Sequence, residues 1–465
     1  MISIYILFAT AVFILFFGLG KKESLFGYIA SVSLLLTSVI SLFSAKGWLK
    51  LDYLSKWAPQ NMLSFGPAEH LYTALITFVV AIVFWLFAKS NEIGTDRLGL
   101  MLFATIGAIM MVAYQHLVVL FLGLETLSIP LFVLAGSDKE RLSSNEAAIK
   151  YFLMGAFSTA IFLLGIAFLY GGTGSMELQS IGLKPSFMHA LEGMPTPVMI
   201  RIGLVLVSIG LLFKVSAAPF HFWSPDVYEG SPNRVMAFMS TVVKSAAFVA
   251  FAKLMVAFSG VKSDWNYWIV AVSMLTILWG NIAALRQKSI KRTLAYSSIA
   301  HAGYLLIYIL IATESSDFLL LIYLIAYAFS SVALLAMSHQ LHNGLEESLE
   351  FNVFNGLSRK QPTMALLLAV FVFSVAGIPV TAGFAAKFYL FSNAFSMYPF
   401  LVFVGLLGSA ISIAYYFKFI KAAYLEKPEN DGVINDNRWI YWLLAVILVA
   451  IGVFGSYILQ FVAVS

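Results

Sequence analysis

The segment LGLMLFATIGAIMMVAYQHLVVLFLGLETLSIPLFVLAG occupies residues 98–136, and it contains no basic residue and one acid, Glu125. Its 39 residues are about twice the roughly 20 that one helix needs to cross a bilayer. We therefore divide it into two transmembrane helices that meet near His116. Apolar stretches of this length are far longer than the strands of a membrane barrel, so helices are the expected spanning element.

Similar stretches recur along all 465 residues of the chain. A composition of 61% hydrophobic and 11% charged residues excludes a large water-soluble globule, because such proteins carry about 25% charged residues. The predicted fold class is all-α, a polytopic membrane bundle of about 14 transmembrane helices. The apolar stretches lie near residues 1–17, 24–45, 70–88, 98–115, 118–136, 147–171, 198–220, 235–258, 266–285, 294–313, 317–338, 364–392, 397–424 and 439–462.

The distribution of basic residues predicts an orientation. With the N-terminus outside, 18 Lys and Arg residues fall in inner loops, 6 in outer loops and 4 in spans. Inner loops of membrane proteins carry the excess of basic residues, so we expect both termini outside. The stretch 1–17 has no preceding positive charge, which does not fit a signal peptide. The loop 46–69, with Trp48, Tyr53 and Trp57, suits an interfacial anchor, and the loop 339–362 suits an amphipathic surface helix.

Four charged residues lie well inside the predicted spans: Glu125, Lys214, Lys244 and Lys387. Each costs at least about 2.5–3.5 kcal/mol on insertion scales, and intramembrane charges of this kind mark ion or proton paths. The alternative is that they form buried ion pairs that lock helices together. Lys253 also lies in a span, but near its outer end, where its side chain can extend to the membrane surface.

Two spans contain helix breakers close to these lysines. Pro219 follows Lys214, and Gly377, Pro379 and Gly383 precede Lys387. Proline removes a helical hydrogen bond, and discontinuous membrane helices often line ion sites at the interface of structural repeats. We expect inverted repeats of five helices at 97–258 and 259–424, after three N-terminal helices at 1–96 and before a last loop and helix at 425–465. The second break would then open outward and make Lys387 the exit-side group.

No cofactor site is evident on this chain. Cysteine is absent, which excludes iron–sulfur clusters and thiolate zinc sites. We expect neither a metal site nor nucleic-acid binding, and the glycines at 171–174 follow a membrane helix rather than a strand, against dinucleotide binding. His301 lies inside a span and could relay protons, although a single membrane histidine often only packs. His221 adjoins the first break.

Three ordered motifs resemble a known family. SAAPFHFWSPDVYEG at 216–230, RTLAYSSIAHAGY at 292–304 and AGIPVTAGF at 376–384 resemble subunit N of bacterial NADH–quinone oxidoreductase, respiratory complex I, and EAAIKYF at 146–152 fits too. The resemblance spans about residues 97–424. The chain departs from the family pattern at Asn233-Arg234 and at Val380, where a second proline is usual.

The resemblance implies an antiporter-like membrane-arm subunit in the bacterial inner membrane that translocates protons through Glu125, Lys214, Lys244 and Lys387. Its partners would be related antiporter-like subunits, small membrane subunits and the lipid bilayer. NADH, FMN, iron–sulfur clusters and quinone would belong to partner subunits, so the chain would act as part of a translocating oxidoreductase. Two alternatives stay open at this point: a subunit of a sodium/proton antiporter or membrane hydrogenase, and a structural scaffold that does not pump.

Overall fold

The computed structural model describes residues 1–18, 23–49, 62–87, 94–182, 198–313, 317–342, 349–428, 432–434 and 437–463. In these residues every regular element is a helix, beside three isolated β-bridges, so the all-α prediction is confirmed. The α-helices are α1 (Ile2–Gly18), α2 (Glu23–Ala45), α4 (Pro67–Leu86), α5 (Thr95–Ala113), α6 (Leu117–Ala135), α7 (Leu142–Thr173), α8 (Leu178–Gly182), α10 (Val198–Lys214), α11 (Trp223–Gly230), α12 (Asn233–Phe238), α13 (Lys244–Ala257), α14 (Lys262–Leu285), α15 (Ile290–Ile311), α16 (Asp317–Leu341), α17 (Leu357–Lys360), α18 (Pro362–Ala376), α19 (Ala382–Phe395), α20 (Pro399–Tyr424) and α21 (Arg438–Ala463).

The membrane character of the bundle follows from helix length and composition. Eleven helical stretches of the described chain are long and apolar enough to cross a bilayer, and α1 and α18 are shorter apolar helices. The apolar run at 98–136 divides as predicted into α5 and α6. His116 caps the start of α6, where its Nδ1 accepts a hydrogen bond from the backbone N–H of Val118 over 3.3 Å.

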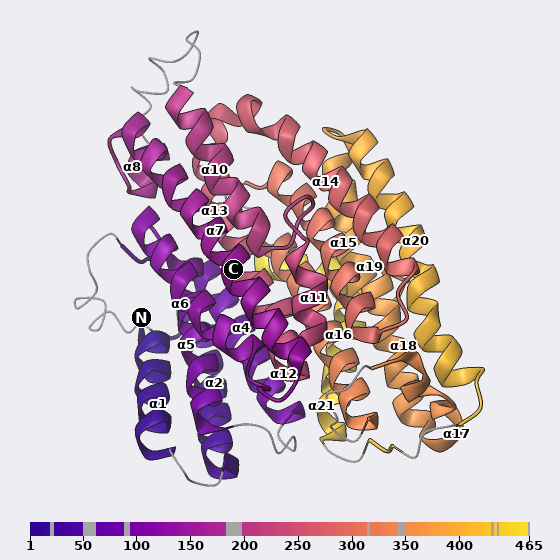
Figure 1. The fold of residues 1–465 in the computed structure, drawn as a ribbon. Coiled ribbons are helices and arrows are strands. Elements are labelled where there is room, and N and C mark those ends of the chain that lie inside the picture. Colours follow the sequence, from indigo (N-terminus) through magenta and orange to yellow (C-terminus); the bar gives the residue numbers. More distant parts are fainter. Residues whose placement is uncertain are drawn as a thin grey trace.

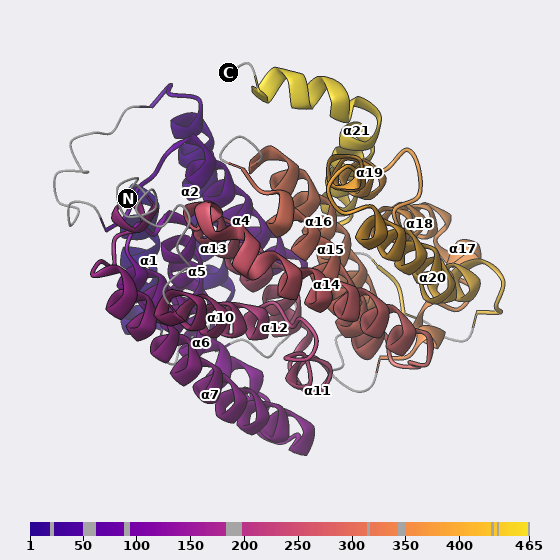
Figure 2. The same ribbon diagram turned by 90° about the horizontal axis from the view of Figure 1, so that it is seen from above.

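The helices differ sharply in burial, which sorts them into an interior and a periphery. From α12 through α13 every residue is buried except Lys253, Val256 and Ala257 near the end of α13, and α15 is nearly all buried. In contrast, α7 and α14 expose large apolar side chains along their outer faces. Figure 1 shows α1 and α2 at one end of the bundle and α17 to α20 at the other, and Figure 2 shows α7 along one edge. Exposed apolar faces are what lipid or a neighbouring membrane subunit would cover.

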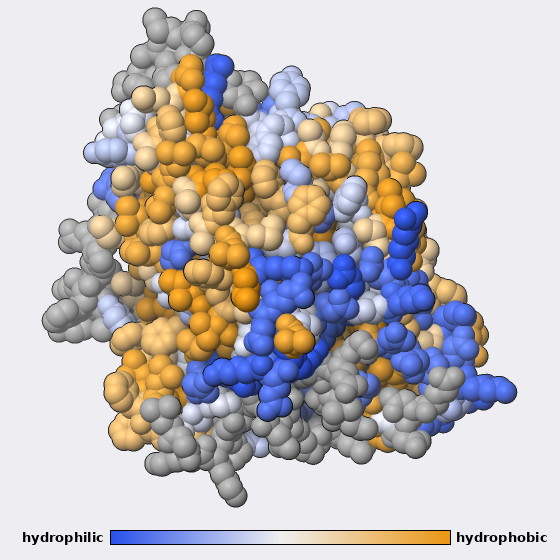
Figure 3. All heavy atoms as spheres, in the orientation of Figure 1, coloured by the Kyte–Doolittle hydropathy of each residue, from blue (hydrophilic) through white to orange (hydrophobic). Residues whose placement is uncertain are grey.

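Polar residues are confined to part of the surface. In Figure 3 hydrophobic residues cover most of the visible face, and hydrophilic residues gather over the region where Figure 1 places α11. The charged residues of this region include Lys150 at the start of α7, Asp226 and Glu229 on α11, and Arg292 at the start of α15. All of them lie at the predicted inner end of the bundle.

One prediction about the loops is wrong, and another falls largely outside the described residues. The described part of 339–362 is not one surface helix: α16 continues to Leu341, a 3₁₀ turn covers Phe351–Phe354, and α17 follows. Leu341 and Leu349 are buried against the bundle, because this apolar pattern packs on the protein rather than on lipid. Residues 343–348 lie outside the described chain, as do Tyr53 and Trp57 of the predicted interfacial anchor.

Candidate functional site

Three lysines from three different helices are buried in the interior. Lys214 ends α10, Lys244 begins α13 and Lys387 lies in α19. None of them is more than 5% exposed. A buried ammonium group persists only where polar groups replace its lost hydration, so the surroundings of each lysine define the site.

Lys214 is held by a hydroxyl and two aromatic rings. Its Nζ donates to Ser128 Oγ over 2.6 Å and lies 5.8 Å and 5.5 Å from the ring centroids of Phe132 and Tyr151. Ser128 lies one turn after Glu125 on α6. A cation above aromatic faces gains electrostatic energy without a counter-charge in direct contact.

Glu125 was expected well inside a span, but its side chain is not deeply buried in the bundle. It is half-buried, and its Oε1 accepts a hydrogen bond from Thr159 Oγ1 of α7 over 2.8 Å. In the described structure no ion pair within 4.0 Å joins it to Lys214, although the charge of Glu125 acts on that lysine. Glu125 therefore lies in the seam between α6 and α7, close to the surface of the bundle.

The break at Pro219 has its freed backbone groups satisfied by other residues. The Phe213 carbonyl at the end of α10 accepts hydrogen bonds from the indole N–H of Trp223 and from the backbone N–H of Ser216. The backbone N–H of Ala218 donates to Thr276 Oγ1 of α14 over 3.0 Å. Irregular backbone within a membrane is tolerated only when protein or water satisfies it in this way.

Lys244 reaches from α13 to α15. Its Nζ donates to the backbone carbonyl and the hydroxyl of Ser298, and it lies 5.5 Å from the ring centroid of Tyr327 on α16. A π-helical turn, Met239–Val243, immediately precedes Lys244. Such turns insert an extra residue into a helix and occur frequently at functional sites.

His301 lies between Lys244 and Lys387. Its Nδ1 and Nε2 lie 2.8 Å and 3.4 Å from the hydroxyl groups of Tyr323 and Tyr416. A cavity of about 10 Å³, lined by His301, Tyr327, Ser374 and Lys387 among others, separates the histidine from the lysine. This volume has room for about one water, and Ser374 Oγ has no other hydrogen-bond partner in the described chain. A bridging water is thus compatible with the geometry.

Lys387 stabilises the second break directly. Its Nζ donates to the Ala376 carbonyl over 2.8 Å and to Ser409 Oγ over 3.1 Å, so it satisfies a carbonyl that the end of α18 leaves free. Gly377 has φ 84°, and a Cβ there would lie 2.8 Å from Lys387 Cδ. A Cβ at Gly383 would lie 1.7 Å from the Ser374 carbonyl oxygen. Gly383 is therefore required by close approach to the backbone, and Gly377 by its positive φ. Pro379 is exposed between the two half-helices.

The residues that depart from the family pattern also have defined positions. Val380 has φ 77°, a value that the ring of a proline cannot reach, so the backbone of this break differs from one with a second proline. Asn233 and Arg234 are buried at the start of α12 rather than lying in an open loop. Asn233 Nδ2 lies 2.9 Å from His339 Nδ1, and Arg234 donates to the Phe87 carbonyl.

Lys253 does not simply extend to the membrane surface. Its Nζ forms an ion pair with Glu69 Oε1 over 2.9 Å, and its side chain is 19% exposed. Glu69 belongs to the first turn of α4 and not to the preceding loop. Its Oε2 accepts a hydrogen bond from the Gly66 N–H, and this cap starts the helix three residues before the apolar stretch predicted at 70–88.

Sequence reasoning missed the hydroxyl and aromatic residues between the lysines. Tyr228 interacts with Ser298 and lies near Tyr151 and Tyr327, so it sits between the surroundings of Lys214 and those of Lys244. A tyrosine in a membrane helix carries no sequence signal that distinguishes this position from ordinary packing. Only the fold shows which tyrosines meet.

An ionic cluster at the predicted inner end was also missed. Asp226 of α11 accepts from Lys150 over 2.8 Å and from Arg292 over 3.0 Å, and Arg292 also contacts Glu229 over 2.8 Å. Burial acts to raise the pKa of Asp226, but the hydrogen bonds from Lys150 and Arg292 outweigh it and leave the pKa below its ordinary value. The cluster ties the half-helix after the first break to α7 and α15.

Comparisons with known proteins agree with these features. Residues 114–412 match the family model described as NADH:quinone oxidoreductase/Mrp antiporter, TM. The chain is 44% identical over 336 residues to NADH-quinone oxidoreductase subunit N of Trichlorobacter lovleyi, which covers 71% of this chain and 68% of the relative. It is 39% identical over 411 residues to subunit N of Cytophaga hutchinsonii, with 86% and 87% covered.

Solved structures give the same overall shape. A chain of respiratory complex I from Thermus thermophilus superposes with a TM-score of 0.79 at 30% identity, covering 98% of each chain. A chain of an archaeal membrane-bound sulfane sulfur reductase gives 0.84 at 23% identity, covering 99% of this chain and 95% of that one. A chain of the Mrp complex from Dietzia sp. gives 0.77 at 18% identity, covering 100% and 96%. The last two show likeness of fold alone.

Proposed function

Because the chain belongs to the family of NADH-quinone oxidoreductase subunit N, we propose that it translocates protons in the membrane arm of respiratory complex I. Electron transfer from NADH to quinone then takes place in partner subunits, which carry FMN and the iron–sulfur clusters. The chain contains no cysteine to hold such clusters. Its contribution to the enzyme is movement of protons and not redox chemistry.

The line of buried cations carries this proposal. Lys214, Lys244 and Lys387 are separated by hydroxyl, imidazole and aromatic groups rather than by aliphatic side chains alone. Direct proton transfer needs donor and acceptor within about 2.6–3.2 Å, or one water between them. Ser128, Ser298 and the one-water cavity beside His301 supply such intermediates.

Glu125 is proposed to control the charge of Lys214. An opposite charge at close range favours the protonated lysine, and withdrawal of that charge favours release of its proton. In the structure Lys214 bonds to Ser128 while Glu125 bonds to Thr159, which corresponds to a separated state. Rotation of the two side chains toward one another would form the tight pair.

The inverted five-helix repeats also remain a proposal, supported by helix packing. In the first repeat α5 packs on α6 and α7 on α10, and in the second α14 packs on α15 and α16 on α18, which are equivalent pairs. Gly107 and Gly280 bring the backbones of α5/α6 and of α14/α15 close together. Gly107 and Gly280 are 173 residues apart in the sequence, and Lys214 and Lys387 are separated by the same number of residues.

We further propose fourteen spans in the bacterial inner membrane, with both termini on the outer side. Each predicted apolar stretch overlaps at least one observed helix, and the basic residues favour this orientation. The half-helices α18 and α19 count as one span, whereas α11 follows the seventh span, 198–220, at its predicted inner end. The related antiporter-like subunits and small membrane subunits of the complex are the expected partners.

The two alternatives are less well supported. A subunit of a sodium/proton antiporter shares the fold, but identity to the Mrp chain is 18%, against 39% to subunit N of Cytophaga hutchinsonii. A scaffold without transport does not account for three lysines buried at a cost of at least about 2.5–3.5 kcal/mol each.

The decisive experiment combines isolation with transport. The intact complex containing this chain is extracted gently, its co-purifying chains are identified, and it is reconstituted into vesicles for measurement of protons moved per NADH oxidised. We expect flavin and iron–sulfur subunits to co-purify, and we expect Lys244→Met and Glu125→Gln to lower that ratio in assembled complexes. A normal ratio in both variants would refute proton translocation by this line of residues.

A further inference from the structure

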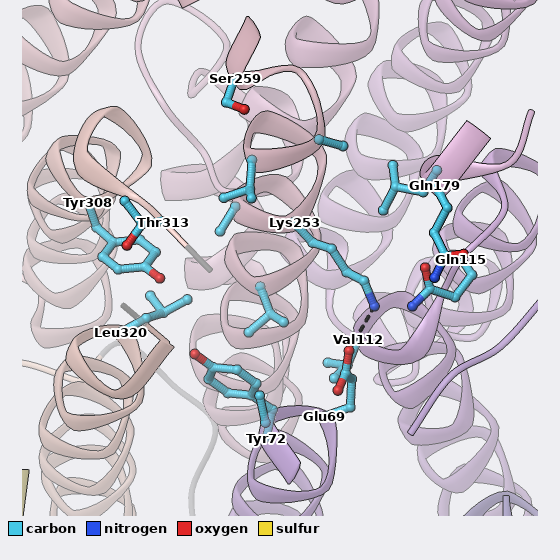
Figure 4. Close-up of a pocket in the computed structure, with 16 residues that line it drawn as sticks. Glu69, Tyr72, Val112, Gln115, Gln179, Lys253, Ser259, Tyr308, Thr313 and Leu320 are labelled. Carbon is cyan, nitrogen blue, oxygen red and sulfur yellow. Dashed lines mark hydrogen bonds and ion pairs between the residues drawn. The ribbon is translucent and has the colours of Figure 1, made fainter. Parts of the chain in front are cut away.

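A second, much larger cavity opens at the predicted outer end of the bundle. It lies between α4, α13, α15 and the start of α16, and its volume is about 440 Å³. Figure 4 shows Tyr72, Tyr308 and Leu320 on one side of it and the ion pair of Lys253 with Glu69 on the other. Polar side chains at this end of the bundle also line it: Gln115, Gln179 of α8, Ser259 of a 3₁₀ turn and Thr313.

The ion pair in this cavity is held from several directions. Glu69 Oε1 accepts from Lys253 Nζ over 2.9 Å, and Glu69 Oε2 accepts from the Gly66 N–H over 3.0 Å. Glu69 lies in the first turn of α4, where the helix dipole favours a negative charge. Lys253 lies about one turn before the end of α13. Lys253 Nζ also lies 5.5 Å from the ring centroid of Tyr114, whose hydroxyl donates to the Ala250 carbonyl.

The cavity lies within about one to two helical turns of Lys244 and His301 on three helices. On α13, Val249 of its lining follows Lys244 by five residues, or about 8 Å of helix rise. On α15, Tyr308 follows His301 by seven residues, or about 10 Å, and in Figure 4 its side chain points into the cavity. On α16, Leu320 lies one turn before Tyr323, which is hydrogen-bonded to His301.

We propose that this cavity is the water-filled outlet of the chain, with the carboxylate of Glu69 as its proton-accepting group. This inference rests on the proton translocation proposed above. Intervening waters carry the proton from His301 to the cavity, because the distance exceeds direct hydrogen-bond reach. There it adds to a carboxylate oxygen of Glu69 and breaks the ion pair with Lys253. The same oxygen then loses that proton to water on the outer side, and the ion pair forms again.

The outlet differs from the exit beside Lys387 that the inverted second break implies. The cavity at Lys387 has a volume of only about 10 Å³, against about 440 Å³ here. Lys387 then holds the proton at the far end of the line and returns it to His301 across the small cavity that both residues line. Protons leave from His301 through the larger cavity, so transport still requires the Lys387 ammonium group.

Two measurements on the intact complex test the outlet. The first asks whether the cavity is hydrated: Val249→Cys, which lines it, is compared with Ala247→Cys, which is buried on the same helix outside it. The chain has no native cysteine, so a charged, membrane-impermeant thiol reagent added from outside can be located on this subunit by peptide mass spectrometry. We expect modification of Val249→Cys at least tenfold faster than of Ala247→Cys. Equal rates would overturn a hydrated outlet.

The second measurement is the number of protons moved per NADH oxidised in vesicles. Glu69→Gln preserves side-chain size and can still accept from the Gly66 N–H, so α4 should start normally. We expect its ratio to fall as far as that of Lys244→Met. The matched control Glu177→Gln removes an acid from the same end of the bundle but outside the cavity lining, and it should pump normally.

The outcomes separate this inference from the function on which it rests. Loss of pumping in both Glu69→Gln and Lys244→Met supports the outlet. Loss in Lys244→Met alone overturns the outlet and leaves the proposed function intact. Normal pumping in both overturns the proposed function and the outlet with it. An equal loss in Glu177→Gln would mean that any acid at this end matters, and would overturn the specific role of Glu69.

Discussion

Replacement of Lys387 by methionine should separate transport from stability. Met keeps most of the side-chain volume and removes the ammonium group, which donates to the Ala376 carbonyl over 2.8 Å and to Ser409 Oγ over 3.1 Å. Hydrogen bonds to charged groups contribute about 1.5–3 kcal/mol each, so loss of these two short bonds costs about 3–6 kcal/mol. The third bond, to the Val375 carbonyl, is long at 3.4 Å and adds little. The variant also avoids burying a charge, which costs about 2.5–3.5 kcal/mol.

The net destabilisation is therefore roughly 0–3 kcal/mol, small enough for the complex to assemble. Proton transfer along the line, in contrast, loses a titratable group that nothing else in the cavity beside His301 replaces. We expect Lys387→Met to abolish the contribution of this chain to proton translocation. Phe388→Leu, at the exposed neighbouring position, should leave it unchanged.

The assay measures two quantities on the same preparation. The thermal midpoint and subunit content of the purified complex report assembly, and vesicles report protons moved per NADH oxidised. An assembled Lys387→Met complex with the wild-type ratio would refute the reasoning, because it would show that the ammonium group serves only to satisfy the carbonyls of the break. Lys387→Arg should not restore the ratio, because arginine stays protonated and cannot pass on a proton. A wild-type ratio in this variant would also refute the reasoning.

Three further results are expected. Gly383→Ala should prevent accumulation of the chain in membranes, as measured by immunoblot, because its Cβ would lie 1.7 Å from the Ser374 carbonyl oxygen. The control variant Ala382→Gly should accumulate normally, and normal levels of Gly383→Ala would contradict the geometry. A cysteine in place of Ser289 should react with an impermeant label only from the cytoplasmic side, and reaction from outside would refute the orientation. Asp226→Asn should lower the thermal midpoint of the complex more than Asp138→Asn, whose carboxylate forms a single i,i+3 pair. Since the pKa of Asp226 is lowered, the contribution of its carboxylate to stability is complete at neutral pH and should disappear only as the pH falls below about 4. Equal thermal midpoints for the two variants at pH 7 would contradict a stabilising role of the cluster.

The sequence by itself determined that the protein lies in a lipid bilayer and that its fold is all-α. A run such as residues 98–136, with one acid and no base, can bury its backbone polar groups only as helices, because lipid offers no hydrogen-bond partners. The same argument selected Lys214, Lys244 and Lys387, because a charge in an apolar run is costly wherever the helix packs. The sequence also predicted the helix break at Gly377 and Gly383, because residues that disfavour a helix are rare inside an apolar span unless the helix is interrupted there.

Only the tertiary structure decided what surrounds each charge. Glu125 has the same apolar neighbours in sequence as a buried residue, yet its helix face places it in the seam between α6 and α7, beside Thr159. Lys253 and Glu69 are 184 residues apart, and no local pattern pairs them. Composition and periodicity record the cost of placing a charge in the membrane. The compensation for that cost comes from residues on other helices, which only packing brings within hydrogen-bonding distance.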